Sequence, residues 1–319
     1  MKYVFIINPK AGGQDCYPTM VKTIKAVSLR RQLCYEIYIT TCIGDATRFT
    51  AQYDTLKDNN LCCFIACGGD GTLGEVVTGA VGKANCAVGV LPFGTGNDFI
   101  KSFRGKESFI NLFNLLDATL QPIDLLLCGD RYAINLCNIG FDAKVAYNMA
   151  KFKRVPLLNG NMAYNASVLY SLKDKLYCDM RIIFDDGEQL EMPFLLLSAA
   201  NGNSYGGGFY AAPNASINDG LIDFCAIKKI PLYKIAQLIG IYKNGEHIGN
   251  PKVAKYIYYR RCSQLEVSSH DPFTVCIDGE LSTHTNITIS VKPKSLTFLV
   301  PHGSTIKPVV LREPELSSI

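Results

Sequence analysis

Three short stretches of the sequence combine glycines with polar side chains that could bind phosphate and a cation. They are NPKAGG (8–13), GGDGT (68–72) and PFGTGNDF (92–99). Glycine lets a backbone approach a ligand closely, and backbone N–H groups in such loops bind phosphate oxygens. The hydroxyls of Thr72 and Thr95 add donors. Asp70 and Asp98 would repel phosphate on their own, so these residue types predict a Mg2+ ion between the carboxylates and the phosphates.

The same stretches follow or end apolar runs that predict buried strands. The runs are YVFIIN (3–8), LCCFIA (61–66) and CAVGVLP (86–92), and CYEIYIT (34–40) is a fourth strand-like run. Helices are expected between them, at 17–31, 45–57 and 72–81. Strands that alternate with helices indicate a parallel sheet covered on both faces. The carboxyl ends of such strands meet at one edge, where their loops can face a common ligand.

Any one of these loops has a simpler interpretation, as a tight turn between a strand and a helix. Three of them at corresponding strand ends favour a shared phosphate site. The sequence contains no GxxxxGK[ST] phosphate loop and no regular GxGxxG dinucleotide fingerprint. The predicted phosphate site is therefore of another type.

The second part of the chain has a different pattern. After about residue 125, short strand-like runs are separated by turn residues, for example LIDFCAIKKI (221–230) and NITISVKP (286–293). This spacing predicts an antiparallel β-sandwich-like domain with helical exceptions at 142–175 and 231–243. We therefore predict an α/β domain at 1–125, completed by the tail 306–319, and a β-rich domain at 126–305.

Composition excludes several other classes of protein. The chain has 319 residues and a net charge of +4, which is too small to indicate a nucleic-acid partner. No apolar run approaches the roughly 18 residues of a membrane span, and no signal peptide is evident, so a cytoplasmic protein is expected. The 13 cysteines include no CxxC pair, and the four histidines lack zinc-type spacing. Buried free thiols in a reducing compartment are expected.

Taken together, the motifs resemble the catalytic domain of diacylglycerol kinases, which bacterial lipid kinases and sphingosine kinases share. The three glycine-bearing stretches occur in the family's order. The resemblance continues into both predicted domains through PIDL (122–125), YGGGFYAAPNASINDGLIDF (205–224) and CIDGE (276–280). The sequence departs from the family at Gly74, where the family usually has Asn. This change puts the start of the helix or a nucleotide contact in question.

The resemblance implies an ATP site between the two domains, with the β-rich domain binding lipid. Asp70, Asp98 and Asp124 would organise the catalytic Mg2+, and Glu280 would be the general base. A second, structural Mg2+ position of Gram-positive members matches Ser216, Asp219 and Leu221. The implied nucleotide contacts are Asn8, Pro9, Lys10, Ala11, Gly12, Thr40, Gly69, Asp70, Gly71, Thr72, Leu73, Gly74, Glu75 and Thr95.

The residues alone leave simpler alternatives open at three of these places. Asp124 could cap the end of a strand. The Asp-Gly dipeptide at 278–279 is typical of a hairpin turn, which would leave Glu280 as a solvated flank. The segment 218–220 could likewise be an ordinary turn.

The predicted activity is that of an ATP-dependent lipid kinase, which transfers the γ-phosphoryl group to a lipid hydroxyl. Diacylglycerol is the expected acceptor and phosphatidic acid the product. The alternatives are a kinase for a sphingoid base or another lipid alcohol, a metabolite kinase of the NAD-kinase type, and a non-catalytic lipid-binding protein. The expected partner is a lipid substrate at the inner face of the membrane, contacted transiently. Dimers are common in the family, so a homodimer is a candidate assembly.

Several basic residues are candidates for the membrane contact. They could touch anionic headgroups, or they could form an ordinary solvated surface. They are Lys151, Lys153, Arg154, Lys228, Lys229, Arg260 and Arg261.

Overall fold

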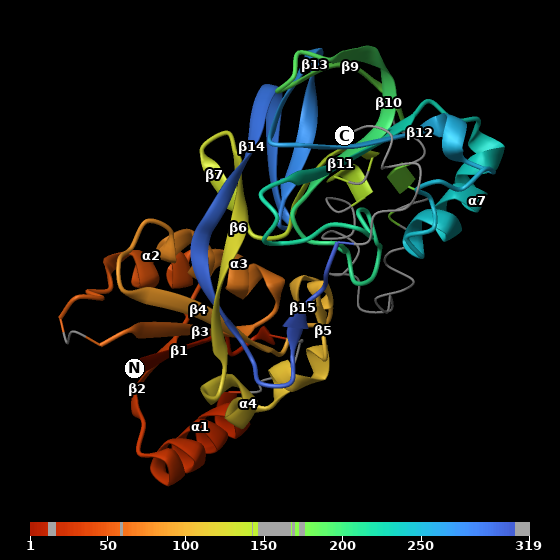
Figure 1. The fold of residues 1–319 in the computed structure, drawn as a ribbon. Helices are drawn as coiled ribbons and strands as arrows, with labels where there is room; N and C mark the ends of the chain where they lie inside the picture. Colours follow the sequence, from red (N-terminus) through yellow and green to blue (C-terminus); the bar gives the residue numbers. More distant parts are fainter. Residues whose placement is uncertain are drawn as a thin grey trace. The chain divides into compact units, whose positions relative to one another are not determined.

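The structure, a computed structural model, describes residues 1–11, 17–57, 60–141, 143–145, 167, 170–171 and 176–309 (Figure 1). The chain divides into two compact units. Unit 1 comprises Met1–Leu125, Ser216–Gly220 and Lys292–Pro308, and unit 2 comprises Leu126–Ala215, Leu221–Val291 and Val309–Ile319. These units share the boundary after residue 125 with the predicted domains, but they assign 216–220 and 292–305 to unit 1. The predicted domain ranges, including the tail 306–319, stay a prediction.

Unit 1 is built on a parallel sheet. Its strands are β1 (Lys2–Ile7), β2 (Cys34–Ile39), β3 (Cys62–Gly68) and β4 (Cys86–Pro92), in the order β4-β3-β1-β2. The end of β14 (Glu280–Val300) continues the sheet beside β4, where Phe298 pairs in parallel with Val88. All seven residues of β3 are buried, which is why this strand is a continuous apolar run in the sequence. The four predicted strands are confirmed.

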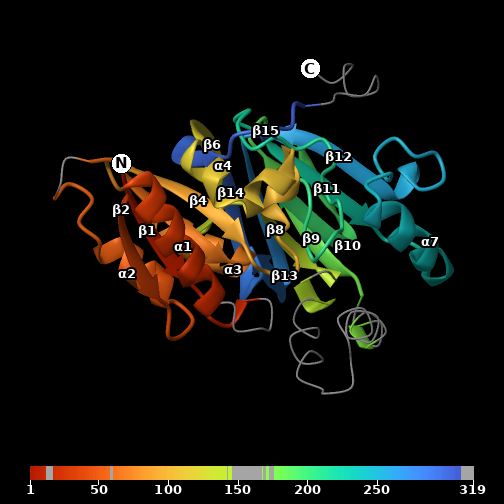
Figure 2. The same ribbon diagram turned by 90° about the horizontal axis from the view of Figure 1, so that it is seen from below.

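Helices cover both faces of this sheet, as the predicted fold class requires (Figures 1 and 2). α1 (Tyr17–Arg31) and α4 (Leu112–Leu116) pack on one face, where Ile24 joins Phe5 and Leu115 in one core cluster. α2 (Asp45–Gln52) and α3 (Asp70–Ala80) cover the opposite face. There the ring of Tyr53, just after α2, meets Phe64 of β3 edge-on at 5.4 Å between ring centroids.

The remaining elements of unit 1 are short. η2 (Phe99–Ser102), β5 (Phe103–Arg104) and η3 (Lys106–Ile110) follow β4, and β15 (Thr305–Ile306) pairs antiparallel with β5. Aromatic rings of these segments pack near the end of β14. The ring centroids of Phe99, Phe103 and Phe109 all lie within 6.5 Å of the Phe298 ring centroid. This aromatic cluster fixes the chain that leaves the loop after β4.

Unit 2 is antiparallel and β-sandwich-like, which confirms the second half of the predicted fold class. It contains the hairpin of β6 (Thr119–Cys128) with β7 (Arg131–Ala133) and the strands β8 to β13, and it begins in the sequence inside β6. The further strands are β8 (Leu136–Gly140), β9 (Cys178–Phe184), β10 (Gln189–Ala200), β11 (Ile222–Lys228), β12 (Ile257–Cys262) and β13 (Gln264–Ile277). The pairings β9–β10, β10–β8, β8–β13 and β13–β9 form a closed cycle, so these four strands leave few open edges.

Apolar side chains cover both faces of the strands in unit 2. One core cluster contains Leu197 and Phe224, and the other contains Leu196 and Cys225, as expected for alternating side chains. α7 (Leu232–Lys243) packs on the second cluster and confirms the helix predicted at 231–243, and η4 (Ala254–Tyr256) follows it. Most of the helix predicted at 142–175, together with Lys151, Lys153 and Arg154, lies outside the described residues.

Two further expectations concern cysteines and membrane spans. All the cysteines in the described part of the chain are free thiols and most are buried, as expected. Burial raises the pKa of Cys62 to about 12 and that of Cys63 to about 11, so these thiols are inert packing groups. Among the described residues, no helix has the length and apolar character needed to cross a bilayer.

Candidate active site

The loops after β3 and β4 touch each other at the carboxyl edge of the sheet in unit 1. A Cβ atom at Gly94 would lie 2.5 Å from the Cα of Gly69, so only glycine allows this approach. Phe93 donates its backbone N–H to the carbonyl of Gly68 at 2.8 Å and extends the pairing of the two strands. Neither Gly69 nor Gly94 has a positive φ. These glycines are therefore required by close packing of the two loops and not by a left-handed backbone.

The first loop is tied to the start of α3. The side-chain amide of Asn8 donates to the hydroxyl of Thr72 at 3.2 Å, and its Oδ1 accepts the N–H of Lys10 at 3.0 Å. Thr72 also packs against Gly68, where a Cβ would lie 2.3 Å from the threonine hydroxyl. At the end of β2, Thr40 donates its N–H and its hydroxyl to the carbonyl of Ile7. Three strand ends are thus brought together, whereas Gly12 lies outside the described residues.

Gly96 lies beside the carboxylates of both Asp70 and Asp98. A Cβ atom at Gly96 would lie 3.2 Å from Oδ2 of each carboxylate. Asp70 is the first residue of α3, and its Oδ1 accepts the N–H of Phe99 at 3.1 Å. Asp98 is buried, and the ammonium of Lys101 donates to its Oδ1 at 2.5 Å. The structure therefore places two carboxylates and one lysine at the edge that the glycine loops form.

The surroundings of Asp70 penalise its charged form. Burial raises the pKa of Asp70 above its ordinary value. The negative charge of Asp98 adds to the rise, whereas backbone hydrogen bonds from Asp98 and Phe99 and the positive charge of Lys101 oppose it. A carboxylate whose charged form is penalised in this way, beside a second carboxylate, fits a bound cation.

The other predicted nucleotide contacts on α3 differ in solvent exposure. Gly71 is exposed, Leu73 is buried in the core, and open space surrounds the Cβ position of Gly74. The carboxylate of Glu75 accepts the N–H of Ala46 at 3.1 Å and so joins α3 to the start of α2. Their nucleotide roles, like those of Pro9, Ala11 and the exposed Thr95, stay predictions.

Asp124 has the opposite environment to that of Asp70. It is fully buried, and its two carboxylate oxygens accept the N–H groups of Gly220 and Lys294, each at 2.7 Å. Its own N–H donates to the carbonyl of Ile217 at 2.7 Å. Within the described part of the chain, no three His, Cys, Asp or Glu side chains gather into a metal site. Asp124 therefore fastens two segments of unit 1, and its predicted magnesium role stays a prediction.

The predicted second metal position lies in the segment that Asp124 holds. Ser216 is buried and donates its hydroxyl to Oδ1 of Asn218 at 3.0 Å, and Gly220 has the positive φ of a turn. Ser216 and Asp219 belong to unit 1, whereas Leu221 begins the next segment of unit 2. The metal role of these three residues stays a prediction.

Glu280 lies in unit 2, directly after the two-residue turn that joins β13 to β14. Asp278 and Gly279 both have positive φ, which is typical of a type I′ hairpin. The carboxylate of Asp278 accepts N–H groups from the backbone at Ile134, Asn135 and Leu136, at 2.7 to 3.1 Å. The turn is therefore fixed, and it presents Glu280 with its side chain 55% exposed. The predicted hairpin is confirmed, and the base role of Glu280 stays a prediction.

Three residues of these surroundings were missed by sequence reasoning. Lys101 could have been found because it follows Asp98 by three residues, and Asp278 because it belongs to the Asp-Gly turn. Arg131 of β7 forms an ion pair with Oε2 of Glu280. No sequence signal pointed to Arg131, because the two residues are 149 positions apart.

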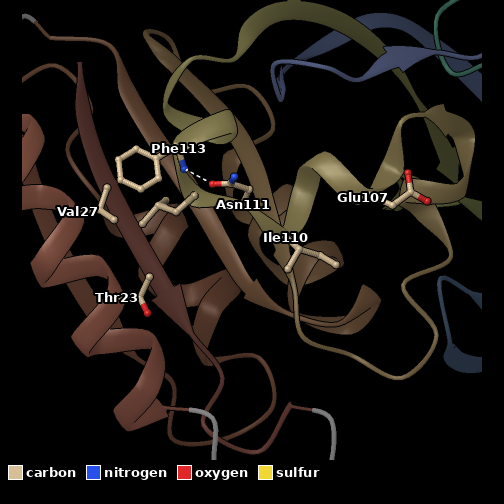
Figure 3. Close-up of a pocket in the computed structure, with 7 residues that line it drawn as sticks. Thr23, Val27, Glu107, Ile110, Asn111 and Phe113 are labelled. Atoms are coloured by element: carbon tan, nitrogen blue, oxygen red, sulfur yellow. Dashed lines mark hydrogen bonds between the residues drawn. The ribbon is translucent and has the colours of Figure 1, made fainter.

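A pocket of about 490 Å³ on unit 1 lies elsewhere (Figure 3). It is lined by side chains of α1 and of the segment from η3 to α4, including Thr23, Ile110 and Phe113. Asn111 caps α4 here by accepting the N–H of Phe113 at 2.9 Å. None of the predicted site residues lines this pocket.

Comparisons with known proteins agree with the two halves of this architecture. The profile of the diacylglycerol kinase catalytic domain matches residues 2–128, and that of the YegS C-terminal NAD kinase beta sandwich-like domain matches residues 135–300. The chain is 28% identical over 280 residues to the diacylglycerol kinase of Bacillus subtilis, covering 86% of this chain and 88% of that protein. It is 30% identical over 322 residues to a Pseudomonas aeruginosa protein named "Probable lipid kinase YegS-like", covering 98% and 97%.

A solved structure shares the fold. The crystal structure of a diacylglycerol kinase from Bacillus anthracis superposes with a TM-score of 0.70 at 20% identity, covering 93% of this chain and 96% of that one. The second profile alone spans more than half of the chain, and the Pseudomonas relative matches nearly all of it. The chain therefore belongs to the diacylglycerol kinase catalytic-domain family and is an ATP-dependent kinase.

Proposed function

We propose that the protein transfers the γ-phosphoryl group of ATP to a lipid hydroxyl, with diacylglycerol as the acceptor and phosphatidic acid as the product. The observation that carries this proposal is the pair Asp70 and Asp98, which meet at Gly96 where the glycine loops converge. The names of the relatives support the lipid acceptor. Phosphoryl transfer needs positioning and charge neutralisation more than covalent chemistry from the protein.

The glycine loops would hold the phosphates of ATP. α3 begins at Asp70, and its first turn directs backbone N–H groups toward the same edge as the loop after β4. The hydrogen bond from Asn8 to Thr72 fixes the first loop against that turn. These contacts make a rigid frame, which lowers the entropic cost of aligning the reacting phosphate.

Asp70 and Asp98 would hold Mg2+. Two carboxylates are the usual protein contribution to such a site, because Mg2+ keeps waters and takes further oxygens from the substrate phosphates. When bound, Mg2+ neutralises phosphate charge and orients the group to be transferred. Lys101 pairs with Asp98 and acts on Asp70 only through its charge, so the bound ion would relieve the remaining penalty on ionised Asp70. Asp124 would complete this network, and Ser216, Asp219 and Leu221 would hold the second, structural Mg2+.

Glu280 would accept the proton of the acceptor hydroxyl. The hairpin fixes its backbone, and Arg131 binds it through Oε2. No hydrogen bond from the described part of the chain reaches Oε1, which would take the proton. A positioned carboxylate of this kind contributes roughly 10²- to 10⁴-fold to rate. The acceptor would be met at the inner face of the membrane by transient contact, and a homodimer is the proposed assembly.

The test is the choice of acceptor. The purified protein is incubated with labelled ATP and Mg2+ and with dispersed diacylglycerol, sphingosine or NAD, and the labelled products are separated. Labelled phosphatidic acid is expected, and Asp70→Asn should remove it while the exposed Asp54→Asn should not. Label in a sphingoid base phosphate or in NADP would assign another acceptor, and no label with any lipid would contradict the proposal.

A further inference from the structure

The positive charge of the chain is concentrated in one segment of unit 2. Residues 228–261 contain eight Lys or Arg residues and one Glu, a net +7, so the rest of the chain carries −3 of the total of +4. Arg260 pairs with Asp186 and Glu188, and Arg261 lies 3.5 Å from Asp223. The six lysines of the segment form no ion pair with any carboxylate in the described part of the chain. Their charge is available to a partner.

Two large apolar side chains lie exposed within this basic segment. Leu232 is 64% exposed and Tyr233 is 79% exposed, at the start of α7. The opposite side of the same helix is buried, with Ile235 and Leu238 in the core cluster. Adjacent exposed apolar side chains rimmed by polar residues are typical of protein or membrane interaction sites, and here they are not needed to complete the core of unit 2.

Lysines surround these two residues. The ammonium groups of Lys234 and Lys255 lie 5.6 Å and 5.1 Å from the centroid of the Tyr256 ring, which brings η4 and the start of α7 together. Lys229, three residues before Leu232, lies 5.6 Å from the ring of Tyr177. The exposed pair Leu232 and Tyr233 is thus bordered by Lys229, Lys234 and Lys255. We call these five residues the α7 patch, and α7 is labelled in Figure 1.

We infer that the α7 patch docks on the surface of an anionic lipid membrane. Leu232 and Tyr233 would enter the boundary between headgroups and acyl chains, and the lysines would meet the anionic headgroups. The first turn of α7 contains no acidic residue, so Lys234 lies near the positive end of the helix dipole without an acidic neighbour in that turn. An anionic surface relieves that repulsion. A nucleic acid would match the lysines but would leave the exposed leucine without a role.

The inference rests on the proposed function, because a lipid acceptor would lie in such a membrane surface. The residues of the α7 patch, however, take no part in the proposed catalysis. Binding is therefore measured without ATP, by sedimentation with vesicles of phosphatidylcholine alone or with phosphatidylglycerol added. The wild type should bind only the anionic vesicles. Lys234→Gln/Lys255→Gln should lower the partition coefficient about 25-fold, because each lysine near such a surface contributes about fivefold.

The apolar half of the patch is tested separately. Leu232→Ser/Tyr233→Ser should lower binding about tenfold, and this loss should persist at high salt, where the lysine contribution is screened. Matched controls lie on α1, where Lys22→Gln/Lys25→Gln removes the same charge and Leu29→Ser changes a leucine that is more exposed than Leu232. The controls should bind like the wild type. Melting curves identify any variant that fails to fold.

The outcomes separate this inference from the proposed kinase activity. A water-soluble short-chain diacylglycerol should be phosphorylated normally by both patch variants. Vesicle binding that is lost in the patch variants supports the docking surface even if no lipid acceptor is phosphorylated. Wild-type vesicle binding by both patch variants, or tighter binding of single-stranded DNA than of anionic vesicles, would overturn the inference.

Discussion

Asp70 and Asp124 are both aspartates of unit 1, the first partly buried and the second fully buried, and their charges have different surroundings. Asp124 receives one backbone N–H on each oxygen at 2.7 Å, from segments that it fastens together. Asp70 faces Asp98 across Gly96, and burial raises its pKa. Asp70 also receives two backbone N–H groups, from Asp98 and Phe99, but burial and the adjacent charge of Asp98 still penalise its ionised form. The adjacent carboxylate of Asp98 therefore distinguishes Asp70, for which we propose a bound cation, from Asp124, which holds two segments of the fold together.

The same distinction recurs in the hairpin of unit 2. Asp278 accepts three backbone N–H groups and fixes the turn, whereas Glu280, two residues later, is exposed and held by a single arginine. Two acids in one short motif thus serve different purposes. The motif DGE contributes a structural acid first and an exposed acid second, for which we propose the role of base.

The sharpest test of the comparison is Asp70→Asn. We expect phosphoryl transfer to fall about 10²- to 10³-fold, because the amide cannot supply the charge that organises Mg2+. The melting temperature without nucleotide should stay unchanged or rise, because the unfavourable buried charge is gone. Single-turnover rates and melting curves measure the two effects. Wild-type turnover at saturating Mg2+ would contradict the role of Asp70.

Glu280→Gln should have the next largest effect, a fall in kcat of about a hundredfold with little change in ATP affinity. Gln keeps the size and the contact with Arg131 but cannot take the proton of the acceptor. ATP binding is measured separately from single-turnover rates. The exposed Glu191→Gln of the same unit serves as the control. A rate within about threefold of wild type, under 1 kcal/mol, would return Glu280 to the role of a solvated flank.

Asp124→Asn should act on stability in the opposite direction to Asp70→Asn. An amide would direct its NH2 group toward one of the two backbone donors, so the free energy of unfolding should fall by about 1–3 kcal/mol. Urea unfolding of the two variants side by side gives the comparison. Equal stability of both variants would mean that the two sites do not differ as their hydrogen bonds indicate.

Substitutions at two glycines of α3 test whether the helix that begins at Asp70 can be stabilised without loss of activity. Gly74→Ala should stabilise the protein by about 1 kcal/mol, because open space surrounds its Cβ position. Gly79→Ala should destabilise it by about 1–3 kcal/mol, because the new Cβ would lie 2.6 Å from the carbonyl oxygen of Thr47. Thermal melts measure both. Loss of activity in Gly74→Ala at unchanged stability would assign that glycine a nucleotide contact.

The smallest effect is on pH dependence. The folded-state pKa of Asp70 is raised, so its ionisation opposes folding, and stability should rise as pH falls through that pKa. Without Mg2+, the stability advantage of Asp70→Asn over wild type should be largest at neutral pH. It should disappear below the ordinary aspartate pKa of about 4. Parallel melts of both proteins from neutral to acidic pH measure it.

Asp45 provides a control of opposite sign. The N–H of Thr41, with the hydroxyls of Thr41 and Tyr38 and the guanidinium of Arg48, lowers the pKa of Asp45 to about 2 against its burial. Its contribution to stability is present at neutral pH and is lost as pH falls from about 4 toward 2. Asp45→Asn should therefore lose stability relative to wild type at neutral pH and not in strong acid. The same sign for Asp45→Asn and Asp70→Asn would contradict the comparison.

Local sequence signals were enough to predict the parallel strands, the hairpin and the order of the glycine motifs. Buried parallel strands such as β3 are continuous apolar runs, and an Asp-Gly pair favours the positive φ angles of a tight turn, so both signals are local. The helix expected over 142–175 could not be judged in the same way, because most of it lies outside the described residues.

The partners that stabilise the charge of each acid can be identified only from the tertiary structure. Asp124 meets an N–H that is 170 residues away, and Glu280 meets an arginine that is 149 residues away. The glycines at 69 and 94 are needed because two loops touch, which no local pattern reveals. The residue type determines which hydrogen bonds a side chain can form. The fold determines which groups lie close enough to form them.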